Sequence, residues 1–242
     1  MSTLVDLYQK YSDHNQEAVY VTDKNSCHSY IEDVYESFFE PYRDKEVNLL
    51  EIGVAYSGSI LLFKEYFNNA QIYGIDPFLP DPCTELWGPN GTPKEVSQGL
   101  IENPPEGIHI VVDDAYQETV ANKLPKFDFI IDDGPHTPET QAKCAEVYLP
   151  RLKENGVMFI EDINIDWGFY VDQPEDKEIL QHPTFQMILE HVPEDKYDYK
   201  LFDLRANVVG RPGIDWSSPG NCPEKGRVDN IILAIKHKNC TE

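Results

Sequence analysis

Positive charge is scarce in this sequence of 242 residues, which has 20 lysines and arginines against 43 aspartates and glutamates and a formal net charge of −23. Such a chain repels phosphate backbones and anionic lipid headgroups, so neither a nucleic acid nor a membrane surface is expected as its partner. The acidic residues are spread along the chain and are not gathered in one tail. We therefore expect most of them to form a solvated acidic surface.

Cysteine pairs and long apolar runs are also missing. The five cysteines include no CxxC pair, and an odd, scattered set of thiols is typical of proteins in a reducing compartment. No apolar run approaches the roughly 20 residues that a membrane-spanning helix needs. Residues 1–16 lack the basic start and apolar stretch of a secretory signal. These absences predict a cytoplasmic protein.

Short apolar segments that alternate with helical segments dominate the rest of the chain. This alternation predicts an α/β fold built on a parallel sheet, and we expect a single domain over residues 1–242. The last of these segments reads as a strand that runs antiparallel to its neighbours. The expected strands are Val47–Ile52, Gln71–Asp76, Ile108–Val112, Phe127–Ile131, Val157–Ile160, Tyr197–Asn207 and Asp229–His237, and the expected helices are Ser59–Phe67, Pro138–Leu152 and a segment near Leu180–His191.

The helix expected after Phe127–Ile131 has clear end signals. Thr137 is a candidate N-cap and Pro138 suits the first turn, while Asn155–Gly156 is expected to end the helix and turn into the next strand. Two longer insertions, 77–107 and 163–196, interrupt the alternation and are expected to be lids over a ligand. Residues 1–45 are expected to form an N-terminal cap segment.

A glycine-containing turn follows the strand Val47–Ile52, with the sequence EIGVAYSGS over residues 51–59. In open α/β sheets, ligands bind beyond the carboxyl ends of the strands, where glycine lets the backbone approach them closely. Asp76 ends the next strand, where a carboxylate can accept hydrogen bonds from both ribose hydroxyls of a nucleotide. The pattern fits S-adenosylmethionine or NAD, and it also fits a tight turn capped by an acid. The expected contacts within the turn are Glu51, Gly53, Tyr56, Ser57 and Ser59.

Acidic residues end two further strands. Asp132 and Asp133 follow Phe127–Ile131, and Glu161 and Asp162 follow Val157–Ile160. If the two strands are neighbours, Asp133, Glu161 and Asp162 can converge on one hard cation such as Mg²⁺ or Mn²⁺. Alternatively, the acids merely cap the loops that follow them.

His136 lies three residues after Asp133, beyond a Gly-Pro turn. Metal coordination lowers the pKa of an acceptor hydroxyl, and an imidazole near neutral pKa suits the base that takes its proton. We therefore expect Asp133 and His136 to be catalytic.

Several of these segments together resemble one enzyme family. LLEIGVAYSGSILLFKEYF with IYGID is similar to the first two motifs of class I methyltransferases, and IIDDGPH with FIED is similar to the macrolide-sugar O-methyltransferases and the cephalosporin-hydroxylase-like group. The upstream segment TDKNSCHSYIEDVYESFFEPYR also resembles that group. The resemblance implies a Rossmann-like fold with about seven mostly parallel strands and helices on both faces.

The resemblance also implies roles for particular residues. Glu51 and Gly53 would line the methionine end of S-adenosylmethionine and Asp76 its ribose, while Asp133, Glu161 and Asp162 would hold the metal and His136 would act as base. Because VDDA stands at 112–115, either Asp113 or Asp114, with Ala115, is expected to face the adenine; Asp132 is also expected near the cofactor. Expected substrate contacts are His28, Tyr30, Trp167 and Tyr170.

These observations together predict a metal-dependent O-methyltransferase that uses S-adenosylmethionine and Mg²⁺ or Mn²⁺ and acts on a hydroxyl of a sugar, a glycan or a sugar-bearing metabolite. The alternatives are a methyltransferase of aromatic diols, an NAD-dependent oxidoreductase and a non-catalytic nucleotide-binding module. The expected partner is a small molecule or glycan, and a homo-oligomer is left open.

Overall fold

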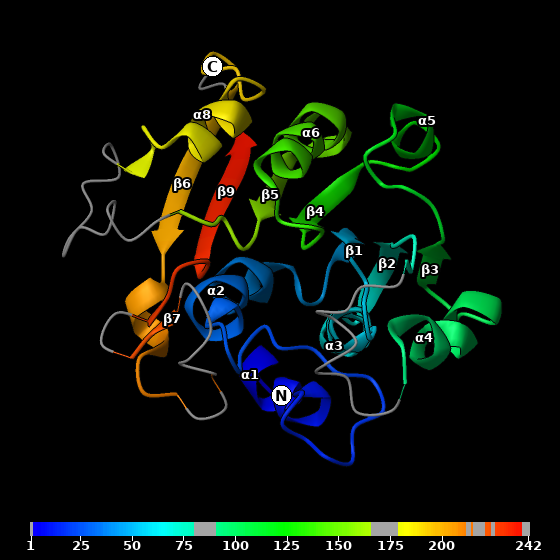
Figure 1. The fold of residues 1–242 in the computed structure, drawn as a ribbon. Helices are drawn as coiled ribbons and strands as arrows, with labels where there is room; N and C mark the ends of the chain where they lie inside the picture. Colours follow the sequence, from blue (N-terminus) through cyan, green and yellow to red (C-terminus); the bar gives the residue numbers. More distant parts are fainter. Residues whose placement is uncertain are drawn as a thin grey trace. The chain divides into compact units, whose positions relative to one another are not determined.

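The computed structural model describes residues 2–79, 91–165, 179–211, 214, 221–223 and 226–238 (Figure 1). The chain divides into two compact units. Unit 1 comprises residues 1–115 with 211–214, and unit 2 comprises residues 116–210 with 215–242. No helix in the described part of the chain is both long enough and apolar enough to cross a membrane.

Unit 1 is built on three parallel strands in the order β3-β2-β1, with Glu46 opposite Asn69 at the start of the β1–β2 ladder and Ile52 opposite Ile75 at its end. Most of β1 and the carboxyl end of β2 are buried, as in parallel sheets covered by helices, whereas in β3 only Ile108 is buried. Its strands are β1 (Glu46–Ile52), β2 (Asn69–Ile75) and β3 (Ile108–Val111), and its helices are α1 (Leu4–Tyr11), the π-helix η1 (Ile31–Tyr35), α2 (Glu36–Phe39), the 3-10 helix η2 (Glu40–Tyr42), α3 (Gly58–Tyr66) and α4 (Pro93–Glu102).

Unit 2 is built on four strands in the order β4-β5-β9-β6, in which β4 and β5 run parallel and β9 runs antiparallel to both neighbours. Its strands are β4 (Phe127–Asp132), β5 (Leu152–Ile160), β6 (Tyr197–Asp203), the short pair β7 (Asn221–Cys222) and β8 (Gly226–Arg227), and β9 (Ile231–His237). Its helices are α5 (Glu118–Ala121), α6 (Pro138–Tyr148), the 3-10 helix η4 (Leu149–Arg151), α8 (Pro183–Leu189) and the 3-10 helix η6 (Arg205–Val208).

The described residues therefore form an α/β fold with seven principal strands, mostly parallel, which confirms the expected fold class. The expected start of α6 is also confirmed, because the Thr137 hydroxyl accepts a hydrogen bond from the backbone N–H of Thr140 and Pro138 occupies the first turn. Whether the chain acts as one domain stays a prediction.

Three local expectations were wrong. The strand expected over Tyr197–Asn207 ends at Asp203, and Arg205–Val208 form a 3-10 helix instead. Asn155–Gly156 does not separate a helix from a strand but lies inside β5, which begins at Leu152. The ladder pairs Phe127 with Leu152 and Phe129 with Val157, so the Asn-Gly turn signal is absorbed by an irregularity in the strand.

The 77–107 insertion is also not wholly a loop, since α4 occupies residues 93–102 behind a capping box of Thr92 and Glu95. The turn residues before it masked this helix in the sequence.

Candidate functional site

Strained backbone marks the carboxyl ends of four parallel strands. Among the described residues, five that are not glycine have a positive φ. Each follows a strand of its own unit: β1, β2, β4 or β5. Such conformations cost the folded state about 1–3 kcal/mol each and cluster at binding and catalytic sites. They are Ala55 (42°), Ser57 (61°), Phe78 (48°), His136 (56°) and Asp162 (51°).

In unit 1 the carboxylate of Asp76 holds the turn after β1 in place. Its Oδ2 accepts hydrogen bonds from the backbone N–H groups of Val54 and Ala55, at 2.8 and 3.0 Å, and its Oδ1 accepts one from Phe78 at 2.5 Å. This is the capping role that the sequence left open. One lone pair of Oδ1 remains to accept from a ribose hydroxyl, because each carboxylate oxygen has two lone pairs and both on Oδ2 are used.

Beneath the same turn, Glu51 is fully buried and paired. Its Oε2 accepts a hydrogen bond of 2.6 Å from the Ser59 hydroxyl, and its Oε1 lies 3.4 Å from the ammonium of Lys24, which is itself buried. A buried carboxylate needs such partners because the loss of hydration is costly. Lys24 comes from the TDK part of the N-terminal segment, so this segment reaches the base of the expected cofactor site.

The other residues expected at the cofactor site differ in accessibility. Tyr56, Ser57 and Ala115 are buried, whereas Asp113 and Asp114 are exposed. The Ser57 hydroxyl lies 2.7 Å from that of Ser97 in α4, which donates in turn to the carbonyl of Ala55. Gly53 has φ 85°, a value that glycine adopts without strain, and its N–H donates to Ile75 of β2. Contacts with α4 and β2 thus hold the turn after β1 in place.

In unit 2 the carboxyl ends of β4 and β5 lie side by side. Asp132 pairs with Ile160 in register, and the N–H of Glu161 donates to the carbonyl of Asp132 at 3.0 Å. The neighbouring strands that the sequence argument required are therefore present.

Beyond these strand ends, three side chains converge. The Nε2 of His136 lies 3.7 Å from Oδ1 of Asp133 and 3.5 Å from Oδ2 of Asp162. One donor atom from each of the three lies within 4.8 Å of the others, which is close enough for one ion.

Glu161 is not part of this converging group. Its side chain is 1% exposed, and the carbonyls of Glu161 and Asp162 accept hydrogen bonds of 2.9 and 3.4 Å from the side-chain amide of Gln141 in α6. Gln141 is also buried and fixes the backbone that presents Asp162. A role for Glu161 as a ligand stays a prediction.

The carboxylates around His136 make its environment strongly acidic. Burial lowers the pKa of His136, but the charges of Asp162, Asp133, Asp132 and Asp229 outweigh this effect and raise it overall. The imidazole is 33% exposed, so a proton can still exchange with solvent or with a substrate. In the absence of a cation, the raised pKa favours the protonated ring.

Asp132 is a fully buried carboxyl group behind this cluster. Burial raises its pKa to about 6, against the lowering effect of the Tyr116 hydroxyl, which donates to Oδ1 at 2.9 Å. Gly134 leaves room for that hydroxyl, because a Cβ at this position would lie 2.0 Å from it. Asp132 thus lies inside the structure next to the cluster, and a direct contact between Asp132 and a cofactor stays a prediction.

The expected substrate contacts receive no support from the described residues. His28 and Tyr30 stack on each other at 4.6 Å between ring centroids and are only 3% and 1% exposed. Trp167 and Tyr170 lie outside the described residues, as do parts of both expected lids, at 80–90 and 166–178.

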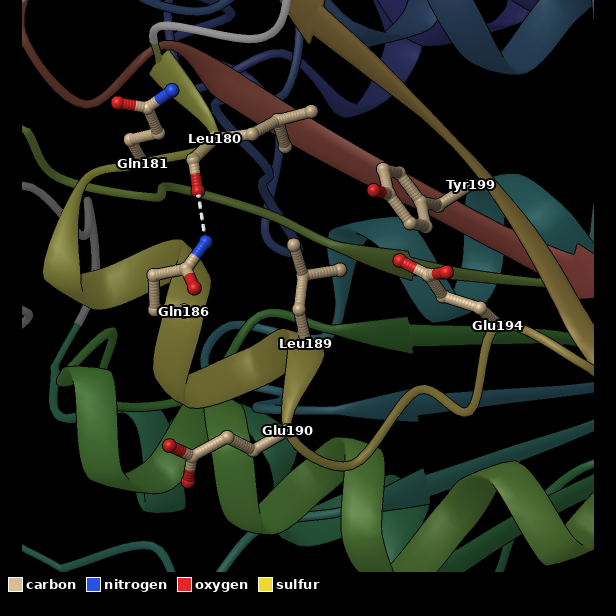
Figure 2. Close-up of a pocket in the computed structure, with 7 residues that line it drawn as sticks. All are labelled: Leu180, Gln181, Gln186, Leu189, Glu190, Glu194 and Tyr199. Atoms are coloured by element: carbon tan, nitrogen blue, oxygen red, sulfur yellow. Dashed lines mark hydrogen bonds between the residues drawn. The ribbon is translucent and has the colours of Figure 1, made fainter.

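A cavity of about 500 Å³ lies beside α8 in unit 2 (Figure 2). Leu180, Leu189 and Tyr199 supply an apolar wall, and Glu190 and Glu194 add carboxylates. None of the residues expected to bind a substrate or cofactor lines it. The chemistry of the strand ends is therefore a better guide to the site than this hollow.

Sequence reasoning missed three supporting residues: Lys24, Gln141 and Tyr116. Each contacts a residue at or near a strand end from a distant part of the chain. The local spacing of residues in the sequence therefore does not predict the contact. Only the position of Lys24 in the TDKNSCHSY segment carried a signal.

Comparison with known proteins agrees with this geometry. Residues 50–163 match the family model of a methyltransferase domain, a span that includes the turn after β1 and the acidic ends of β4 and β5. The chain contains a methyltransferase domain. The expected resemblance to class I methyltransferases is thereby confirmed at the level of the domain.

Its relatives include enzymes that methylate sugar hydroxyls. The chain is 27% identical over 157 residues to the 8-demethyl-8-alpha-L-rhamnosyl tetracenomycin-C 2'-O-methyltransferase of Streptomyces olivaceus, covering 60% of this chain and 36% of that protein. It is 28% identical over 143 residues to the mycinamicin VI 2''-O-methyltransferase of Micromonospora griseorubida, covering 56% and 31%. The chain thus spans about a third of the length of these relatives, and its methyltransferase domain is distantly related to O-methyltransferases.

The fold matches as well. The MycE methyltransferase of the mycinamycin pathway, solved with Mg and SAH, superposes with a TM-score of 0.57 at 18% identity, covering 98% of this chain and 56% of that one. At this identity the likeness shows the fold alone.

Proposed function

We propose that this chain transfers a methyl group from S-adenosylmethionine to a hydroxyl of a sugar, and that the transfer depends on Mg²⁺ or Mn²⁺. The observation that carries the proposal is the convergence of Asp133, His136 and Asp162 beyond two adjacent strand ends. In support, one relative is named as a 2'-O-methyltransferase of a rhamnosyl tetracenomycin and another as the mycinamicin VI 2''-O-methyltransferase. These names favour methyl transfer over hydride transfer to NAD, and a sugar over an aromatic diol.

The donor set fits a hard divalent cation. Asp133 and Asp162 offer carboxylate oxygens, which Mg²⁺ and Mn²⁺ prefer, and their backbone anchors at β4 and Gln141 hold them in place. A cation bound there would lower the pKa of an acceptor hydroxyl. It would also relieve the repulsion between the two carboxylates.

In this proposal His136 is the base. Its Nε2 would take the proton of the acceptor hydroxyl while the hydroxyl oxygen bonds to the methyl carbon and the bond from that carbon to the sulfonium sulfur breaks. The products would be the methyl ether, S-adenosylhomocysteine and a protonated imidazole. Asp133 and Asp162 flank the ring and stabilise the imidazolium that results. The turn after β1, held by Asp76, would face the cofactor with the one lone pair that remains on Oδ1 of that carboxylate.

The deciding experiment is a methyl-transfer assay with labelled S-adenosylmethionine. The acceptors are rhamnosides and other glycosides on one side and catechols on the other, each assayed with excess chelator and with Mg²⁺ or Mn²⁺ restored. We expect label on a glycoside only when a divalent cation is present. Label on catechols alone would show that the acceptor is an aromatic diol and not a sugar. Full transfer in excess chelator would show that the reaction needs no divalent cation.

The matched variants are Asp133→Asn and Glu154→Gln. The first removes a charged ligand and should lower turnover at least about 100-fold, while the second removes an exposed acid of β5 and should leave turnover unchanged. Equal turnover in the two variants would contradict the assignment of Asp133.

A further inference from the structure

Unit 1 contains a second group of metal-ligating side chains, formed by Asp23, Cys27 and His28. One donor atom of each lies within 4.8 Å of the others. The Cys27 thiol lies 3.2 Å from Oδ2 of Asp23, and Nε2 of His28 lies 3.8 Å from the same oxygen. None of these three side chains belongs to the strand ends described above.

We propose that Asp23, Cys27 and His28 bind a zinc ion, at a site separate from that of Asp133 and Asp162. Sulfur, nitrogen and oxygen together are a typical zinc donor set, whereas Mg²⁺ avoids thiolates. A tetrahedral zinc ion sets its ligand atoms roughly 3.3–3.8 Å apart. The distance from the Cys27 sulfur to Oδ2 of Asp23, 3.2 Å, lies just below this range, and that from Nε2 of His28 to the same oxygen, 3.8 Å, lies at its upper end.

Neighbouring side chains fix the positions of the proposed ligands. Arg211 donates from Nη1 to the carbonyls of Asn25 and His28, at 2.9 and 2.8 Å, and so fixes the loop on either side of Cys27. His28 is held by its stack on Tyr30. The side chain of Asp23 is 32% exposed and that of Cys27 is half-buried, so an ion can enter from solvent and keep a water as its fourth ligand.

The charges also balance. A zinc ion with one thiolate and one carboxylate is neutral, and the thiol proton leaves to solvent when the ion binds. The positive charge of Arg211 is matched by its ion pair with Glu32.

The position of the site indicates what the ion would do. In the sequence, Lys24 lies between Asp23 and Cys27. Its ammonium lies 3.4 Å from Oε1 of Glu51, beneath the turn after β1. A zinc ion on Asp23, Cys27 and His28 would therefore fasten the loop that delivers Lys24. The ion is structural in this proposal and takes no part in methyl transfer.

The test uses Co²⁺ as a spectroscopic substitute in the full chain, with Mg²⁺ in excess to occupy the other site. We expect one equivalent of Co²⁺ to give a thiolate-to-cobalt charge-transfer band in the near ultraviolet, which Zn²⁺ removes. Cys27→Ser should abolish the band and His28→Gln should weaken Co²⁺ binding on the order of 100-fold. Cys144→Ser, which changes a buried thiol of unit 2, should keep the band.

A band that persists in Cys27→Ser, or Co²⁺ binding without any thiolate band in the wild type, would overturn the proposal. If Cys27→Ser fails to fold, alkylation of the wild-type protein decides instead. Zn²⁺ should protect the peptide containing Cys27 from iodoacetamide, and Mg²⁺ should not. Equal labelling with both ions would overturn the proposal as well.

Discussion

His136 lies close enough to two carboxylates, at 3.7 and 3.5 Å, to act either as a base or as a third ligand of the cation. The two roles differ in what the imidazole contributes. A base affects only the step in which the proton moves, whereas a ligand contributes to the affinity for the ion itself.

We expect His136→Ala to lower turnover about 10²–10⁴-fold, the usual contribution of a positioned base. Mn²⁺ affinity, measured by electron paramagnetic resonance of the free ion, should change little. The base assignment would be wrong if affinity for Mn²⁺ and turnover fell together. His136→Gln serves as the control, because glutamine keeps a polar side chain but cannot take the proton. Its turnover should therefore fall as far as that of His136→Ala.

The buried carboxyl of Asp132 makes stability depend on pH. Its folded pKa of about 6 lies above the ordinary value of 3.8. The folded state therefore favours the protonated carboxyl, and this contribution to the free energy of unfolding is complete below pH 3.8 and is lost as the pH rises through 6. In excess chelator we expect Asp132→Asn to raise the free energy of unfolding at pH 7.5, on the order of 2–3 kcal/mol, and to flatten its decline between pH 4 and 7.

Urea unfolding at several pH values measures this effect. Asp198→Asn, which changes a 54% exposed acid of β6, should leave the pH profile as it is. A profile for Asp132→Asn that follows the wild type would show that Asp132 ionises normally in the folded protein.

At the scale of elements, the start of α3 depends on a close approach between two backbones. A Cβ on Gly58 would lie 2.2 Å from the backbone carbon of Val21, and the N–H of Gly58 donates to the carbonyl of Val21. Neither side is a flexible side chain, so the clash can be relieved only by moving the N-terminal segment. The N-terminal segment and the turn after β1 are thus packed tightly against each other.

Gly58→Ala should therefore destabilise the protein by about 1–3 kcal/mol, as overpacking does. Gly99→Ala is the matched control inside α4, where a Cβ would meet only the Tyr20 hydroxyl at 3.8 Å. That change should be neutral or stabilising, since alanine favours a helix by about 0.5–1 kcal/mol. Similar urea midpoints for the two variants would contradict the close packing of Gly58.

The elements differ in how far the sequence predicted them. The strands and α6 were predictable because apolar runs and the Thr137-Pro138 start act locally. Asn155–Gly156 misled because a turn signal inside β5 is overridden by pairing with β4. The convergence of Asp133 and Asp162 was predictable because strand ends meet at one sheet edge. The position of Glu161 outside the converging group and the support from Gln141 depend on side-chain directions that spacing does not encode.

At the scale of the whole molecule, the net charge of −23 repels itself in the compact state. We expect the Tm in excess chelator to rise by several degrees between 20 and 500 mM NaCl, because the Debye length shortens from about 20 Å to about 4 Å. The gain should shrink at pH 5.5, nearer the sequence pI of about 4.5. A salt response that is equal at both pH values would mean that charge repulsion is not its cause.

The five residues with positive φ have a consequence for how this protein could change over generations. Glycine or asparagine would adopt these conformations with less strain. At Ala55, Ser57, His136 and Asp162, the present residue therefore places more backbone strain on the folded state than glycine or asparagine would. Selection for thermal robustness alone would therefore tend to erase the strand-end residues first. A lineage that no longer needed the chemistry would reveal this by relaxing to glycine or asparagine at these positions while the buried strands stayed unchanged.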